Sequence, residues 1–365
     1  MIIKDKGMFM EGKKRKGTGK GLLAVGMAVL LAGCGSAQSG ESAVETDRQL
    51  ITIGFSQLGS ESDWRVANTE HMKTIFSIEN GYDLLLDDAQ QKQEKQITAI
   101  RNYIQQEVDY IVVAPVMETG WDTVLQEAKE AGIPVIVVDR MVKVEDDSLY
   151  TAWVGSDFEQ EGKKACAWLS SYIEEQQIAP ADIHIIGIQG TLGASAQIGR
   201  SDALTEAVAE NGWDLITMEE GDYTQAKSHE VMQRLIGEHP ETNVVYCEND
   251  NEAFGAIEAL EEAGYTVGRD LKNGEVMILS FDSTHMGLQY VRDGKIALDT
   301  ECNPLQADKV EDIIQKLQNN QSVEKQTYVE EQLFCTDLTI PSVQVGDRTY
   351  DVTEVTDVLL EERQY

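Results

Sequence analysis

The chain has 365 residues and a formal net charge of −34, from 64 acidic and 30 basic residues. Such an acidic surface repels nucleic acid and anionic lipid headgroups and favours solubility, so we expect neither of these as a binding partner. The length is sufficient for two domains of ordinary size.

The first 33 residues have the layout of an export signal. A basic region, Lys13 to Lys20, precedes the apolar run GLLAVGMAVLLAG, which is too short to span a bilayer comfortably. The run continues into LAGC, which ends at Cys34 and resembles a bacterial lipobox; an ordinary cleaved signal is the alternative. Residues 34–49 are small and polar, as a flexible tether should be. We therefore predict a lipoprotein signal peptide over 1–33, lipidation of Cys34 and a tether over 34–49.

The remaining cysteines and histidines give no sign of a metal site. Four cysteines lack close spacing and lie in apolar segments, which favours buried thiols, with one disulfide as the alternative; they are Cys166, Cys247, Cys302 and Cys335. None of the five histidines stands in a ligand spacing such as HxxxH. We predict no metal and no cofactor.

From Ile51 the chain alternates strand and helix regularly. The predicted strands of the first half are continuous apolar runs rather than alternating ones, as in parallel strands covered by helices on both faces; they lie at 51–56, 83–86, 110–114 and 135–138. A helix over about 64–79 follows the first strand, and Ile97, Ile100 and Ile104 mark the next helix by their spacing of three and four.

The same pattern then repeats, which predicts a second lobe. A helix from Phe158 to Glu174 is followed by strands near 183–188, 213–219, 243–247 and 276–280. A late helix over 305–319 and a strand over 327–334 return to the first lobe. The predicted fold is α/β, with two doubly wound parallel-sheet lobes joined by a multi-strand hinge. The predicted lobes are 50–153 plus about 303–335, and 154–302 plus about 336–365.

Polar residues follow the predicted strands at the edge where open parallel sheets bind ligands. They are Glu61, Trp64, Arg65, Asp139, Arg140, Arg200, Asn249 and Asp282. An Asp or Asn there often only caps the next helix, and that alternative stays open for each one. Arg140 directly after Asp139 fits capping poorly, because a guanidinium paired with a carboxylate suits a polyhydroxylated ligand. The indole of Trp64 suits the C–H face of a sugar ring.

Known catalytic motifs are absent from the sequence. It has no GxSxG, HExxH or P-loop motif, and the glycine-rich segment from Gly190 to Arg200 lacks the GxGxxG spacing of a dinucleotide site. We therefore predict a binding protein rather than an enzyme.

Several motifs resemble one family in the same order along residues 50–340. They are GFSQLGSESDWR, DAQQKQEKQI, VDYIVVAPVMETGW, AGIPVIVVDR, IQGTLGASAQIGR, END and SFD. The chain resembles the substrate-binding proteins of bacterial ABC sugar importers, in the ribose/galactose branch with the type I periplasmic binding protein fold, and especially its galactofuranose-binding members. The resemblance implies that the eight residues above contact the sugar, and it adds Tyr223 as an aromatic contact. Asp63, Glu248 and Ser283 depart from the family pattern.

The resemblance implies a function outside the cytoplasm. The expected protein is a monomer, anchored to the cell membrane only through lipidated Cys34. It would capture a monosaccharide, such as galactofuranose, between its lobes and deliver it to an ABC permease. A sugar receptor that feeds a sensor kinase or chemoreceptor is the alternative. A sugar-responsive repressor would need a DNA-binding segment where residues 1–50 supply a signal and a tether.

Overall fold

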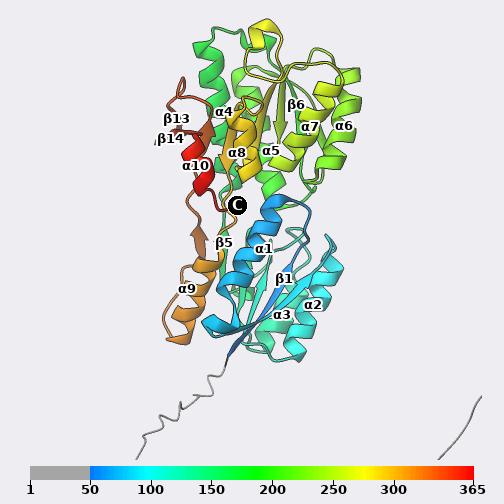
Figure 1. Ribbon diagram of the computed structural model, residues 1–365. Helices are drawn as coiled ribbons and strands as arrows, with labels where there is room; N and C mark the ends of the chain where they lie inside the picture. Colours follow the sequence, from blue (N-terminus) through cyan, green and yellow to red (C-terminus); the bar gives the residue numbers. More distant parts are fainter. Residues whose placement is uncertain (1–49) are drawn as a thin grey trace, which may run out of the picture. The chain divides into compact units, whose positions relative to one another are not determined.

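The structure, a computed structural model, describes residues 50–365. The predicted signal peptide, the tether and Cys34 lie outside these residues. The described chain builds a six-stranded sheet and an eight-stranded sheet, each with helices packed against it (Figure 1). The predicted α/β fold with two lobes is confirmed.

The first lobe is built on the six-stranded sheet, in which all neighbouring strands are parallel. In sheet order its strands are β11 (Gln326–Tyr328), β5 (Ala152–Gly155), β4 (Val135–Val138), β3 (Tyr110–Val113), β1 (Ile51–Gln57) and β2 (Tyr82–Asp88). Its helices are α1 (Asp63–Ile75), α2 (Gln93–Gln105), α3 (Asp122–Glu130) and α9 (Ala307–Gln318), with 3-10 turns η1 (Ile78–Asn80) and η2 (Asp147–Leu149).

The second lobe is built on the eight-stranded sheet, which is mixed rather than purely parallel. In sheet order its strands are β13 (Ser342–Val345), β14 (Arg348–Glu354), β12 (Leu333–Cys335), β10 (Leu298–Glu301), β9 (Met277–Asp282), β8 (Val244–Cys247), β6 (His184–Gln189) and β7 (Asp214–Glu220). The strand pairs β10–β12 and β13–β14 are antiparallel. Its helices are α4 (Phe158–Glu175), α5 (Ser195–Asn211), α6 (Gln225–Glu238), α7 (Asp250–Glu262), α8 (His285–Arg292) and α10 (Asp357–Glu362), with 3-10 turns η3 (Pro180–Asp182) and η4 (Leu271–Asn273).

Each sheet is buried on both faces, which explains the continuous apolar runs in the sequence. Every residue of β3 and β4 is buried. Alternate residues of these strands belong to two separate apolar clusters: Val112 and Ile136 pack in one, Ile111 and Val135 in the other. The central strands of the second sheet divide their side chains between two clusters in the same way. This doubly wound packing brings the carboxyl ends of the parallel strands to one edge of each sheet.

The chain crosses between the two sheets three times. The first crossing follows β5, the second follows β10, and the third lies between β11 and β12. The predicted single strand over 327–334 is wrong, because it splits into β11 of the first sheet and β12 of the second. The third crossing therefore occupies 329–332, a few residues before the predicted boundary near 335.

The four cysteines of the described region are all free and buried, as predicted; they are Cys166, Cys247, Cys302 and Cys335. In residues 50–365 we find no helix with the length and apolar character that a membrane span requires.

Candidate functional site

One pocket brings together all nine candidate ligand residues of the sequence. It lies between the strand ends of the two lobes, and its lining consists of Glu61, Ser62, Trp64, Arg65, Asp139, Arg140, Phe158, Ala196, Arg200, Tyr223, Asn249, Asp282 and Cys302. The cavity has a volume of about 20 Å³. That is little more than the roughly 10–15 Å³ that one water requires. A ring-sized ligand therefore enters only if the lobes or the lining side chains move apart.

The start of α1 presents the first wall of the pocket. Ser62 caps this helix, and its side chain accepts a hydrogen bond from the backbone N–H of Arg65 at 3.2 Å. This cap places Trp64 and Arg65 in the first helical turn, where both side chains are buried. The indole Nε1 of Trp64 donates to the carbonyl oxygen of Cys302 at 2.6 Å, across the second crossing segment. The indole is thus fixed in orientation by a strand end of the other lobe.

Arg65 is the centre of the charge network in the first lobe. Its Nη2 lies 2.6 Å from Oδ2 of Asp139, and its Nε lies 3.1 Å from Oε1 of Glu61. Burial by itself lowers the pKa of Arg65, but the two carboxylates outweigh it and hold that pKa above its usual value. The sequence had suggested an ion pair between Asp139 and Arg140. That prediction is wrong, because the fold places the guanidinium of Arg65, and not that of Arg140, against the carboxylate of Asp139.

Arg140 reaches toward the second lobe instead. Its Nη1 donates to the carbonyl oxygen of Val116 at 3.1 Å, and its guanidinium lies 5.0 Å from the ring centre of Tyr223. The latter distance is within the range of a cation–π contact. Arg140 therefore contributes a buried positive charge and a contact between the lobes.

Arg200 is the corresponding charge centre of the second lobe. It lies on α5 and is only 2% exposed. Its Nε and Nη2 both lie 2.8 Å from Oε2 of Glu161, its Nη1 donates to the carbonyl of Glu248, and Nη2 lies 3.7 Å from Oδ1 of Asp282. Burial raises the pKa of Asp282 well above its ordinary value, although Arg200 opposes the rise.

Tyr223 and Asn249 complete the second wall. A Cβ at Gly190 would lie 1.9 Å from the ring of Tyr223, so only glycine allows the ring to take this place. The side-chain oxygen of Asn249 caps α7 by accepting from the N–H of Glu252 at 2.8 Å, and its amide nitrogen donates to the carbonyl of Tyr223 at 3.3 Å. Asn249 thus has the capping role that the sequence left open, and it also lines the pocket.

Three buried polar atoms of the lining lack a hydrogen-bond partner within the described residues. They are Nη1 of Arg65, Oε2 of Glu61 and the hydroxyl of Tyr223. A buried polar group without a partner is costly, and it marks a place where an external donor or acceptor is expected. These atoms supply a donor, an acceptor and a hydroxyl that can do either.

The aromatic and small side chains of the pocket form one apolar cluster with members from both lobes. It consists of Trp64, Phe158, Ala196, Tyr223 and Cys302. Sequence reasoning missed Phe158, which opens α4, and Cys302, which follows β10. Looking for polar or reactive residues just after predicted strands would have identified Cys302 only if β10 had been recognised as a strand. The sequence of β10, LDTE, gives little apolar signal.

All three residues that depart from the family pattern, Asp63, Glu248 and Ser283, lie outside the pocket lining. Glu248 accepts hydrogen bonds from the N–H of Gly190 at 2.8 Å and from the hydroxyl of Ser201 at 2.6 Å, within the second lobe. Asp63 is exposed and lies 3.4 Å from the amide of Asn251. The hypothesis that these carboxylates select sugar hydroxyls therefore lacks a direct contact.

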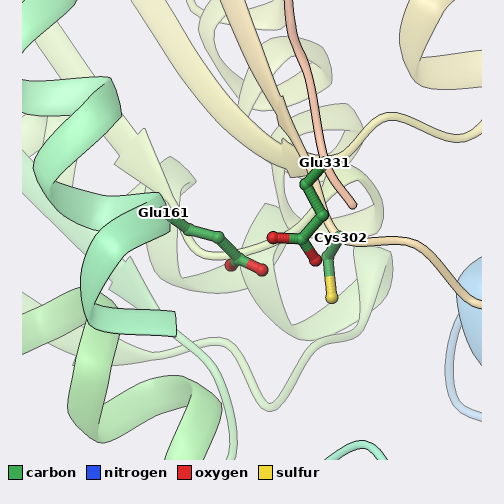
Figure 2. Close-up of side chains that lie close together, drawn as sticks. All are labelled: Glu161, Cys302 and Glu331. Atoms are coloured by element: carbon green, nitrogen blue, oxygen red, sulfur yellow. The ribbon is translucent and has the colours of Figure 1, made fainter. Parts of the chain in front are cut away.

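A buried cluster of two carboxylates and a thiol lies beside the pocket. Figure 2 shows the carboxylate of Glu161 pointing from α4 toward Glu331 and Cys302. One oxygen or sulfur atom from each residue lies within 4.8 Å of the others. The hydroxyl of Ser156 contacts both Glu331 and the Cys302 sulfur, the latter at 3.3 Å. Because Arg200 already neutralises Glu161, a divalent cation would lie beside a buried guanidinium, so we assign the cluster to packing of the crossing segments.

Comparison with known proteins agrees with this geometry. The family model described as "Periplasmic binding protein domain" matches residues 53–320. The galactofuranose-binding protein YtfQ of Escherichia coli is 38% identical over 292 residues, which cover 79% of this chain and 88% of the relative.

Solved structures show the same relationship. A Mycobacterium smegmatis protein in complex with β-D-fucofuranose is 38% identical, with a TM-score of 0.73 over 78% of this chain and 91% of that one. The periplasmic binding component of the arabinose ABC transporter of Shewanella sp. ANA-3, bound to L-arabinofuranose, is 38% identical, with a TM-score of 0.71 and the same coverage. The chain belongs to the periplasmic binding protein family.

Proposed function

We propose that this protein binds a neutral monosaccharide in a furanose form, with galactofuranose as the leading candidate, and delivers it to an ABC transporter. The observation that carries the proposal is the set of unpartnered buried polar atoms on Glu61, Arg65 and Tyr223 inside the two-lobed pocket. A polyhydroxylated ligand offers donors and acceptors to all three. The relatives that bind galactofuranose, fucofuranose and arabinofuranose support the furanose form.

The charges of the pocket support a neutral ligand. Three arginines line it, Arg65, Arg140 and Arg200. Arg65 is paired with Glu61 and Asp139, and Arg200 is paired with the buried carboxylate of Glu161 beside the lining. Burial raises the pKa of Asp282 well above its ordinary value, which favours the neutral form of that carboxyl. Because each sign is present in equal number, the ligand does not have to supply charge. The charged groups then act through hydrogen bonds, each of which contributes on the order of 1.5–3 kcal/mol.

A role in binding without catalysis is part of the same proposal. The carboxylates of the lining are held by arginines rather than placed as an isolated acid–base pair. A turnover assay on the bound sugar tests this point: recovery of the unchanged sugar from the complex is expected, and appearance of a product would overturn it.

The cellular placement is also proposed. We infer an extracytoplasmic monomer held at the membrane by lipidated Cys34, with an ABC permease as its partner. The support is the signal-like sequence before Cys34 together with membership of a periplasmic binding family. A thermal-shift screen of the purified protein against pentoses and hexoses tests the ligand, and co-purification with the permease tests the partner.

A further inference from the structure

The backbone that carries Asp282 is strained. Asp282 has a φ of +102° and Ser283 a φ of +54°, a region that residues other than glycine rarely adopt. Asp282 lines the pocket, and its carboxyl lies 3.7 Å from Arg200. The strained turn therefore determines where this carboxyl, a candidate contact for the sugar, points. Such strain persists only where the surrounding structure holds the backbone in place.

One side of the turn is held within the second sheet. The backbone N–H and the hydroxyl of Ser283 both donate to Oδ1 of Asp299, each at 3.0 Å. Asp299 lies on β10, the strand beside β9. These bonds fix the amide side of Ser283 but leave its carbonyl oxygen to another partner.

The carbonyl side is held by Arg363, which follows α10. Its Nε and Nη2 donate to the carbonyl oxygen of Ser283 at 2.9 and 2.6 Å, and its Nη1 lies 2.7 Å from Oε1 of Glu301. Tyr365 reinforces the contact with Glu301, because its hydroxyl donates to the same Glu301 oxygen at 2.6 Å and accepts from Nη2 of Arg363 at 2.6 Å. Its backbone oxygen also accepts from the N–H of His285, two residues beyond Ser283, at 2.5 Å. The side chain of Arg363 is only 11% exposed.

These contacts link Arg363 to two parts of the pocket. Ser283 directly follows Asp282, and Glu301 directly precedes Cys302, whose carbonyl fixes the indole of Trp64. A single guanidinium therefore joins the ends of β9 and β10 without itself lining the pocket. In Figure 1 the red helix α10 lies beside α8, and the two helices are in contact.

We propose that Arg363 is a positioning residue for sugar binding. It does not line the pocket; it acts through the backbone, by holding the strained Asp282–Ser283 turn and the Glu301–Cys302 strand end in the orientations that the ligand needs. The role in binding rests on the proposed function, whereas the role in holding the turn does not.

The first test is independent of any sugar. We would measure amide hydrogen exchange in a peptide covering residues 281–288, in the full chain, for wild type, Arg363→Ala and the control Arg348→Ala. Arg348 lies exposed on β14 of the same C-terminal segment. Exchange in Arg363→Ala should be faster by about tenfold or more, because the N–H groups of Ser283 and His285 open more often. Unchanged exchange, or an equal increase in Arg348→Ala, would overturn the proposal.

A milder variant covers the case in which Arg363→Ala does not fold. Arg363→Lys keeps a positive charge beside Glu301 but cannot make the forked pair of bonds to the Ser283 carbonyl. It should show faster exchange over residues 281–288 with the fold retained. Exchange equal to wild type in a folded Arg363→Lys contradicts the proposal.

The second test measures sugar affinity by calorimetry. The Kd of Arg363→Ala should be about tenfold higher than that of wild type. The Kd of Arg348→Ala should equal that of wild type. Undiminished affinity in Arg363→Ala overturns the positioning role. If wild type binds no sugar at all, the proposed function fails, and the exchange measurement still decides whether Arg363 holds the turn.

Discussion

The guanidinium of Arg65 lies 2.6 Å from the carboxylate of Asp139, although the two residues are 74 positions apart in the chain. This ion pair joins the first turn of α1 to the loop after β4, and the same guanidinium also binds Glu61. Arg140, the sequence neighbour of Asp139, points to Val116 and Tyr223 instead. The two arginines of the first lobe therefore have different roles, and their variants should differ.

Arg65→Ala should lower the free energy of unfolding much more than Arg140→Ala. Removing Arg65 leaves Glu61 and Asp139 buried without their cation, which costs about 3–5 kcal/mol. Removing Arg140 loses a hydrogen bond to a carbonyl and a contact with Tyr223, about 1–3 kcal/mol. Urea denaturation of both variants checks this. Equal losses of stability would contradict the assignment of Asp139 to Arg65.

Arg140→Ala should still lose sugar affinity, by roughly 3 kcal/mol or about a hundredfold, because a buried donor of the pocket disappears. Calorimetric titration of Arg140→Ala and of Arg65→Ala with the sugar, set beside their free energies of unfolding, separates the loss of affinity from the loss of stability. Affinity at the wild-type level in Arg140→Ala would remove this residue from the site.

The positions of the site residues could be predicted from the sequence, but their pairing could not. Strand-end placement put Glu61, Arg65, Asp139 and Asp282 at one edge because apolar runs and glycine turns define parallel strands locally. The pairing of Arg65 with Asp139 depends on the angle between α1 and β4, which no local pattern encodes.

Strands with polar residues were also harder to predict. The strand β10 reads LDTE, and its buried Asp299 accepts two hydrogen bonds from Ser283, a tertiary contact that the local sequence does not indicate. The segment 327–334 reads as one strand, yet β11 and β12 join different sheets. Such switches are set by tertiary pairing rather than by propensity.

The lobes should separate in the absence of sugar and close on it. The pocket has room for little more than a water, and its lining comes from both lobes, so we expect a sugar ring to be admitted by an opening movement about the three crossing segments. Small-angle X-ray scattering should show a larger radius of gyration without sugar than at saturation. A sugar that gives no heat of binding serves as the control. Identical profiles in all three samples count against the movement.

Glu248 should make the protein less stable as the pH rises. Burial raises the pKa of this carboxyl to about 8, although Ser201, Gly190 and Arg200 favour its charged form. Its ordinary value is 4.5, so between these values the folded state holds a proton that the unfolded state has released. The stability that this group contributes is therefore fully present below pH 4.5 and is lost as the pH rises through about 8.

The variant Glu248→Gln removes this titration. The fall in the free energy of unfolding between about pH 5 and pH 8 should be shallower in Glu248→Gln than in wild type. Glu210→Gln, at an exposed position of α5, should keep the wild-type slope. Parallel slopes for wild type and Glu248→Gln would show that Glu248 is charged in the folded protein.

Cys34→Ala should abolish membrane anchoring. The expected anchor is a diacylglyceryl group on the cysteine of LAGC, because a single acyl chain gives only marginal attachment. The variant should be released or remain unprocessed when cells are fractionated. A mature-length Cys34→Ala protein that stays with the membranes would disprove the lipobox assignment.

Calorimetric titration of the wild-type protein with galactofuranose, arabinose and ribose, beside a sugar acid, tests the central claim most directly. The balanced charges of the pocket and its three unpartnered polar atoms predict saturable one-to-one binding of at least one neutral sugar, strongest for galactofuranose, and no binding of the acid. Heat of binding only with the sugar acid, or with none of the four, would contradict it.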